Sequence, residues 1–277
     1  MHTGSEGWVL FFSLTLSASS AVGGASDLEL KLPGESKARK LTLKDMASRL
    51  KAVTVTIDDP VYKKKKTYDG FVLLEVMKLA GLKDDGQGDE IVFTAKDGYS
   101  PNVSFEMLRA HRAFLTFRER GGSGFEDVAQ GKAMVSPAPY YVVWEEGAKL
   151  AESVPWPYQL VKIELVNFHQ KYHRLYPNGV HKDSSVMKGF LVFKNHCVRC
   201  HSVNLQGGDL GPELNAPQNV TEYWAKDVLK RFIRDASSFR YKDKMPSFLH
   251  LKDQELDEVL DYLEFMKGHK LPPGEGQ

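Results

Sequence analysis

The chain has 277 residues, with 37 Lys and Arg against 36 Asp and Glu and a formal net charge of +1. This balance argues against a nucleic-acid partner, because domains that bind phosphate backbones carry a marked basic excess. The length is sufficient for two domains, each with its own hydrophobic core.

Residues 1–25 predict a secretory signal peptide. An apolar run from Trp8 to Leu16 is followed by small residues, and cleavage is expected near Ala21 to Ala25. The run is too short to span a bilayer, so we expect no transmembrane segment in the mature chain. No Lys or Arg precedes it, which indicates an atypical signal or a true start further upstream; a disordered or buried N-terminal segment is the alternative. The signal predicts export to the bacterial periplasm.

Residues 26–167 predict an α+β domain with a mixed sheet and short helices. Apolar and Thr side chains alternate over residues 52–57, which is typical of a half-buried strand. Thr42 and Ser104 occupy positions suited to helix N-caps, and Gly81 suits a C-terminal cap. Strands and short helices without regular alternation indicate the α+β class. Further strands are expected at residues 90–95, 113–118, 140–145 and 159–166, and helices at residues 42–50, 71–82 and 104–110.

The order of three segments in this domain, "YDGFVLLEVMKLAGL", "EIVFTAKDGYSPNVSFEML" and "PYQLVKIELV", resembles the molybdopterin-binding domain of the sulfite oxidase family. The resemblance implies a molybdenum bound through one cysteine just after an early strand, with arginines nearby for the pterin phosphate. Here the matching region reads "DDPVYKKKKTYDG" and contains no cysteine. We therefore expect no molybdopterin and no molybdenum catalysis in this domain.

Two further segments of the domain each have two interpretations. The glycine-rich residues 120–131 do not form a phosphate-binding motif, because Glu126 and Asp127 would repel an anion; a flexible surface loop is favoured. The four lysines at residues 63–66 would attract an acidic redox partner, but a solvated turn between strand and helix is the favoured interpretation.

Residues 168–183 are expected to connect two domains. This segment carries His169, His173 and His181, of which the first two are four residues apart and would share a helix face. A second metal site or a bis-histidine partner haem is therefore one interpretation. The Pro, Asn and Gly content favours a linker or short packing segment instead.

The segment "FKNHCVRCHSVN", residues 193–204, contains both cysteines. A CxxC pair followed by His suits a thiol redox site, half of a zinc site, or attachment of a c-type haem. No second CxxC supplies further zinc ligands, and the preceding stretch is amphipathic instead of the strand expected of a thioredoxin-like site. The sequence therefore favours haem, with both cysteines used in its attachment.

A haem ligated by His201 needs a second axial ligand, and Met245 precedes a proline in a polar loop downstream. Methionine fills the coordination sphere and leaves no position for a substrate, so this site is expected to transfer electrons. His250 is the next candidate for this ligand.

Residues 184–270, followed by a short tail at 271–277, resemble a class I cytochrome c domain, an all-α fold. Gly189, Phe193 and Tyr262 match its crossing of first and last helices, and residues 222–236 are expected to form one further helix. The resemblance implies one covalent haem c and a role for each site residue. The thioether bonds fall to Cys197 and Cys200, axial ligation to His201 and Met245, and orientation of the His201 ring to the Pro212 carbonyl.

Together these features predict a periplasmic monohaem c-type cytochrome that transfers single electrons, an electron-transfer protein or subunit and not an enzyme. The N-terminal domain is expected to dock it to a larger redox protein or respiratory enzyme complex, association with a membrane complex included. One alternative is a molybdenum-dependent oxidoreductase that acts on a sulfite-type oxyanion through its own haem. Another is a structural subunit of a membrane respiratory assembly.

Overall fold

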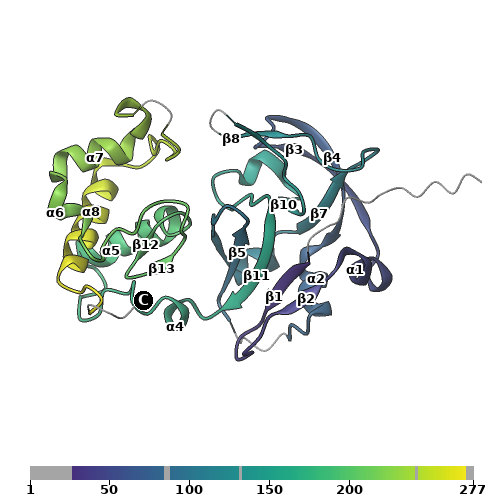
Figure 1. Cartoon of the computed structure of the whole chain (residues 1–277), viewed down its shortest axis with the longest axis horizontal. Coiled ribbons are helices and arrows are strands. Elements are labelled where there is room, and N and C mark those ends of the chain that lie inside the picture. The colour runs from purple at the N-terminus through teal and green to yellow at the C-terminus, as the bar shows by residue number, and fades with distance from the viewer. Residues whose placement is uncertain (1–26, 84–87, 131–132, 241–242, 273–277) are drawn as a thin grey trace, which may run out of the picture.

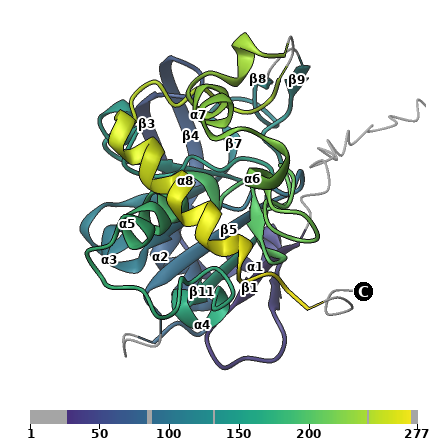
Figure 2. The ribbon, with the colours of Figure 1, turned by 90° about the vertical axis from the view of Figure 1, so that its left-hand side faces the viewer.

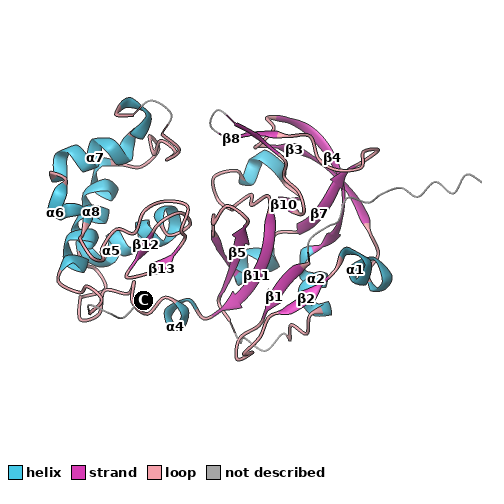
Figure 3. Cartoon of the chain, in the orientation of Figure 1, coloured by secondary structure: helices cyan, strands magenta, loops and turns pink. Residues whose placement is uncertain are grey.

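The computed structural model describes residues 27–83, 88–130, 133–240 and 243–272. The predicted signal peptide lies outside the described residues. The chain forms two lobes, one that contains the long strands and one that is mainly helical (Figures 1 and 3). This arrangement confirms the predicted order of an α+β domain and an all-α domain. A short helix, α4 (Phe168–Lys171), lies where the chain passes from the first lobe to the second.

The first lobe contains a five-stranded sheet in the order β2-β1-β11-β5-β6. Strands β1 and β11 pair in parallel, whereas all the other pairs are antiparallel, so the sheet is mixed as predicted. Its strands are β1 (Leu28–Lys31), β2 (Arg39–Leu41), β5 (Glu90–Ala95), β6 (Asn102–Ser104) and β11 (Leu160–Val166).

A second, antiparallel sheet has the order β10-β7-β4-β3. The predicted alternation in β3 is confirmed, since Val55 and Ile57 are buried and the threonines between them are exposed. Its strands are β3 (Val53–Asp59), β4 (Lys64–Val72), β7 (Ala113–Glu119) and β10 (Tyr141–Trp144). The apolar faces of both sheets meet in one core rich in aromatic side chains.

The lysine run is exposed over residues 63–65, as predicted, but most of it is strand and not turn. The turn ends at Lys63, and the next three lysines are part of β4. Lys66 is buried and its ammonium group contacts Glu119 at 2.5 Å and Glu126 at 2.9 Å. Pairing of β4 with β7 brings Glu119 to this lysine, and the sequence does not display that neighbour. The expected glycine-rich loop ends in a hairpin, β8 (Val128–Gln130) and β9 (Ala133–Val135).

Three short helices of the first lobe confirm the predicted caps. Thr42 and Asp45 form a reciprocal capping box at the start of α1 (Leu43–Arg49). The Ser104 hydroxyl accepts from the Met107 amide at the start of α3 (Phe105–Ala110). After α2 (Leu73–Leu79), Gly81 has φ of 97°, the left-handed conformation that glycine adopts without strain.

The second lobe contains α5 (Ser185–Val192), a π-helical turn (Phe193–Cys197), α6 (Val220–Tyr223), α7 (Lys226–Arg234) and α8 (Asp253–Lys267). The expectation of one helix over residues 222–236 is wrong. The backbone of Trp224 is extended, which separates α6 from α7 and lets the indole pack on Phe232 at 4.9 Å between ring centroids. A small hairpin, β12 (Ser202–Val203) and β13 (Gln206–Gly207), follows the cysteine motif.

Helices α5 and α8 cross in direct contact, and Figure 2 shows α8 lying over α5. A Cβ atom at Gly189 would lie 1.8 Å from the Glu258 carbonyl oxygen, so only glycine permits this approach. Tyr262 lies against Phe193, and its hydroxyl donates to the Leu175 carbonyl at 2.8 Å. The connector is therefore packed on the second lobe. None of the helices in the described part of the chain is long and apolar enough to cross a bilayer.

Candidate haem-binding site

The two cysteines and His201 lie on one continuous turn that leads out of α5. The Val198 amide donates to the Phe193 carbonyl, a π-helical hydrogen bond of 2.9 Å. The amides of Cys200 and His201 then both donate to the Cys197 carbonyl, at 3.0 and 2.9 Å. This tight turn sets both thiols and the imidazole at the wall of a single cavity.

The imidazole of His201 is held from behind by the Pro212 carbonyl, with Nδ1 and the oxygen 2.8 Å apart. A carbonyl only accepts, so Nδ1 carries the proton and Nε2 keeps the lone pair that a metal requires. Burial lowers the pKa of His201, while the Pro212 hydrogen bond opposes that shift; the net result favours the neutral ring. Gly211 lies against the ring, since a Cβ there would be 2.5 Å from Cε1.

The cavity measures about 410 Å³ and has mainly apolar walls. His201 and Met245 both line it, the first from the cysteine turn and the second from the loop between α7 and α8. Much of the remaining wall is apolar: α7 supplies Leu229, Phe232 and Ile233, α8 supplies Val259 and Leu263, and the loop after β13 supplies Leu210, Gly211, Pro212 and Leu214. Residues of α6, the π-helical turn and the loop that carries Met245 complete the lining. Such a lining suits a large, flat, apolar group held by a few polar contacts.

Met245 is half-buried, and its amide donates to the Asp243 carboxylate at 2.9 Å. Met187 and Met266 are buried in the α5 and α8 contact and do not line the cavity. His250 is exposed and is not among the cavity-lining residues; its ring lies 5.5 Å from that of His196. Of the two sequence candidates for the second axial ligand, Met245 is therefore the one whose side chain reaches the cavity.

The thiols lack the properties of a redox or zinc site. Burial raises the pKa of the Cys197 thiol to about 12 and that of Cys200 to about 11, whereas a disulfide-exchange cysteine needs a depressed pKa. Within the described residues, no three His, Cys, Asp or Glu side chains are grouped to hold a metal ion. The two half-buried thiols are not joined to each other and remain free for attachment.

These residues fit a covalently attached haem. Two thiols, an imidazole with a free Nε2 and a thioether converge on one apolar cavity, which is the donor set of a His/Met haem iron. Cys197 and Cys200 would hold the porphyrin edge, and His201 and Met245 would hold the iron. The predicted site residues are thus brought together.

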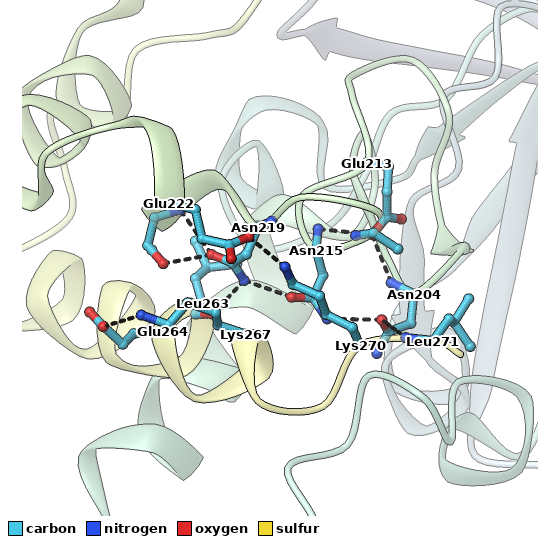
Figure 4. Close-up of polar contacts among 12 residues, drawn as sticks. Asn204, Glu213, Asn215, Asn219, Glu222, Leu263, Glu264, Lys267, Lys270 and Leu271 are labelled. Atoms are coloured by element: carbon cyan, nitrogen blue, oxygen red, sulfur yellow. Dashed lines mark hydrogen bonds and ion pairs between the residues drawn. The ribbon is translucent and has the colours of Figure 1, made fainter. Parts of the chain in front are cut away.

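Sequence reasoning missed a buried polar network in the loops that follow His201, which Figure 4 shows. Asn204, Asn215 and Asn219 are almost fully buried and linked side chain to side chain by hydrogen bonds of 2.7 and 2.8 Å. Glu213 accepts backbone hydrogen bonds beside them. Only the Asn219 and Glu222 capping box has a readable sequence pattern, because burial of isolated asparagines leaves no periodic signal.

The first lobe directly contacts residues 193–201, the turn that carries both cysteines and His201 and is the predicted haem-attachment turn. The Ser100 amide, in the loop between β5 and β6, donates to the Arg199 carbonyl at 2.8 Å. Lys194 of the π-helical turn forms an ion pair of 2.6 Å with Glu90 of β5. Gly98 approaches Asp209 so closely that a Cβ would overlap the carboxylate. The N-terminal domain therefore contacts the turn that carries Cys200.

Asp59, the last residue of β3, is buried in the region where the sequence shows no cysteine. Its carboxylate accepts from the amides of Val61 and Tyr62 and from the hydroxyls of Tyr68 and Tyr141. Nearby cations are also paired, Lys64 and Lys66 with Glu126, and Arg118 and Arg120 with Asp69. The Asp59 carboxylate thus has a structural role, because all these hydrogen bonds come from the protein itself.

The three histidines of the connector do not converge. The ring of His169 packs edge-on against Tyr176 at 4.6 Å, and His173 Nδ1 lies 3.3 Å from the Gln170 carbonyl oxygen. The exposed His181 lies near Asp183. These contacts describe a packing segment, in keeping with its apolar side chains in the second core.

Comparison with known proteins agrees with the site. Residues 186–267 match the family model described as Cytochrome c, so the C-terminal helices form a cytochrome c domain. Domains of this family carry haem c and transfer electrons. The matched segment is well under half of the chain, and no curated protein sequence matches it.

Among solved structures, the chain is similar to the sulfane dehydrogenase SoxCD from Paracoccus pantotrophus. The TM-score is 0.35 at 15% identity, over 51% of this chain and 38% of that chain. This chain thus corresponds to less than half the length of that structure, and a likeness of this degree says nothing about activity.

Proposed function

We propose that the protein is a monohaem c-type cytochrome of the periplasm that passes single electrons to or from a larger redox protein. The observation that carries the proposal is the convergence of four side chains, Cys197, Cys200, His201 and Met245, on one cavity. When bound, the haem supplies a one-electron iron couple.

The chain's own residues would bind, orient and shield that group. The thiols would anchor it, and the Pro212 carbonyl holds the His201 proton on Nδ1, which would leave the Nε2 lone pair available to the iron. The apolar side chains of α7 and α8 would exclude water from the faces of the ring. With His and Met as axial ligands no coordination position is left for a substrate, which favours a carrier over an oxygen-binding or catalytic haem.

The N-terminal domain would serve as a docking module for the redox partner. Support comes from its direct contact with the haem-attachment turn through Ser100 and Glu90, and from the absence of a cysteine after the strand that ends near Ile57. A partner bound to this domain would be held beside the turn that carries Cys200. Membership of a larger respiratory complex is compatible with this arrangement.

The test is expression in a host competent for haem attachment and molybdenum cofactor synthesis. We expect one iron per chain, no molybdenum, and an alkaline pyridine spectrum of a two-thioether haem. The double variant Cys197→Ala/Cys200→Ala should release the haem into acidified organic solvent. Extractable haem in the unaltered protein would refute the attachment, and stoichiometric molybdenum with sulfite-dependent haem reduction would replace the carrier by an oxidoreductase.

A further inference from the structure

The loop that follows the haem-attachment turn contains a carboxylate that bridges two segments of backbone. Glu213 Oε2 accepts from the Leu205 amide at 3.0 Å, and Oε1 accepts from the amides of Asn204, Asn215 and Ala216 at 2.8, 2.9 and 3.0 Å. Four N–H donors converge on the two oxygens. This is the environment of an ionised carboxylate, which only accepts hydrogen bonds.

The bridged segments are the two that form the His201 and Pro212 hydrogen bond. Asn204 and Leu205 form the turn of the β12 and β13 hairpin, which begins directly after His201, and both have positive φ, at 54° and 63°. Glu213 itself directly follows Pro212. The carboxylate therefore ties the segment that supplies the imidazole donor to the segment that supplies the carbonyl acceptor.

Backbone hydrogen bonds hold the same two segments on either side of the pair. The Gly211 amide donates to the Cys200 carbonyl at 2.7 Å, and the Leu214 amide donates to the Ser202 carbonyl at 2.9 Å. Without Glu213, the strained turn at Asn204 and Leu205 would leave its two amides unpaired, and burial of Asn204 makes that costly.

The three buried asparagines Asn204, Asn215 and Asn219 form an asparagine ladder, which anchors the two bridged segments to distant parts of the domain. Asn215 donates to Asn204, whose amide group donates in turn to the Arg174 carbonyl at 3.2 Å and the His269 carbonyl at 2.8 Å. At the other end, Asn219 donates to Asn215 and to the Leu263 carbonyl of α8. Figure 4 shows the ladder running from the hairpin turn to α8. The loop is thus fixed to the connector, the chain after α8 and α8 itself.

We infer that Glu213 is a positioning residue, which together with the asparagine ladder holds the Pro212 carbonyl on His201 Nδ1 and so tunes the haem iron. This inference rests on the proposed haem function. The hydrogen bond controls how much electron density the imidazole gives to the metal, because a stronger bond to Nδ1–H makes Nε2 more basic. A loosened loop would weaken that bond and favour the ferrous state.

The test compares the full-length holoprotein with Glu213→Gln. The glutamine side chain retains the shape, but its NH₂ group replaces one carboxylate oxygen. An NH₂ group cannot accept from a backbone N–H, so at least one of the four hydrogen bonds to residue 213 is lost. We expect a higher reduction potential than in the unaltered protein. In the reduced protein, NMR should show the His201 Nδ1 proton exchanging faster by roughly tenfold, the factor expected for one ordinary hydrogen bond.

Two further variants separate positioning from charge and from general stability. Asn215→Ala cuts the ladder without altering charge and should also speed exchange of the Nδ1 proton. Asp257→Asn removes an exposed carboxylate of α8 that contacts Lys230 and no member of the asparagine ladder, and it should leave proton exchange and potential unchanged.

The outcomes are distinct. A potential shift in Glu213→Gln with unchanged proton exchange would overturn the inference and leave only a charge effect. Unchanged proton exchange in Asn215→Ala would refute the role of the asparagine ladder in positioning the Pro212 carbonyl. This outcome can be read even if Glu213→Gln does not fold. An extractable haem in the unaltered protein would instead refute the proposed function.

Discussion

Lys194, three residues before the first cysteine, forms an ion pair of 2.6 Å with Glu90 at the start of β5. Glu90 is nearly buried and also accepts from the Asn102 amide group at 2.8 Å, while the Lys194 ammonium lies 4.3 Å from the centre of the Phe168 ring. One lysine thus joins the haem-attachment turn, the connector and the first sheet. The pair is a direct charged link between the two lobes.

Lys194→Met should weaken the contact between the lobes. Removal of the lysine leaves the Glu90 carboxylate buried without its cation. We expect the free energy of unfolding to fall by about 2 kcal/mol, between the values typical of exposed and buried pairs. Calorimetry should show two separated unfolding transitions. Adding Glu90→Gln should restore part of the loss. Lys226→Met, which breaks the exposed pair with Asp261, is the matched control and should cost less than about 1 kcal/mol.

Gly189→Ala should push helices α5 and α8 apart where they cross. The added methyl would lie 1.8 Å from the Glu258 carbonyl oxygen, a backbone atom that moves only with its helix. Overpacking of this kind costs about 3 kcal/mol, measurable by urea unfolding. Gly124→Ala, in open space, serves as control. A midpoint for Gly189→Ala equal to that of the control would contradict the observed crossing.

Met245→Ala should remove the sulfur-to-iron charge-transfer band of the oxidised protein and lower its reduction potential, because a thioether ligand favours ferrous iron. Visible absorption and potentiometry measure both effects. His250→Ala should change neither, since that side chain is exposed and outside the cavity lining. Loss of the band in His250→Ala with its retention in Met245→Ala would exchange the two assignments.

The cluster of Lys64, Lys66 and Glu126 predicts sensitivity to acid. Hydrogen bonds from Lys64 and then Lys66 lower the pKa of Glu126 from its ordinary 4.5 to about 2. A carboxyl whose pKa is lower in the folded state stabilises fully above the ordinary value, and this contribution is lost as pH falls from about 4.5 toward about 2. Glu126→Gln should flatten the stability profile in that window. Urea midpoints between pH 2 and 6 measure it, with Glu106→Gln, on the exposed face of α3, as control.

Local patterns in the sequence were enough to predict the three helices of the first lobe and its strands β3, β5, β7, β10 and β11, but not β1, β2, β4 or β6. Alternation in β3 and the caps at Thr42, Ser104 and Gly81 depend on neighbours within a few residues, and the structure confirms them. The break between α6 and α7 was not predicted, because apolar spacing continues through Trp224 while its ring contacts Phe232 and Phe239 in the folded domain. Periodicity reports which face is apolar and not where the backbone turns.

The site divides in the same way. By itself the sequence determined the chemistry of the site. The CxxCH motif places two thiols and an imidazole within five consecutive residues, so they lie close together whatever the rest of the chain does. Only the tertiary structure decided which candidate side chain shares a cavity with His201 and what holds the Pro212 carbonyl. It also decided that Lys66 is buried in β4 and that Lys194 reaches Glu90. These contacts join residues far apart in the chain, and they exist only once strand pairing and helix crossing have fixed which surfaces meet.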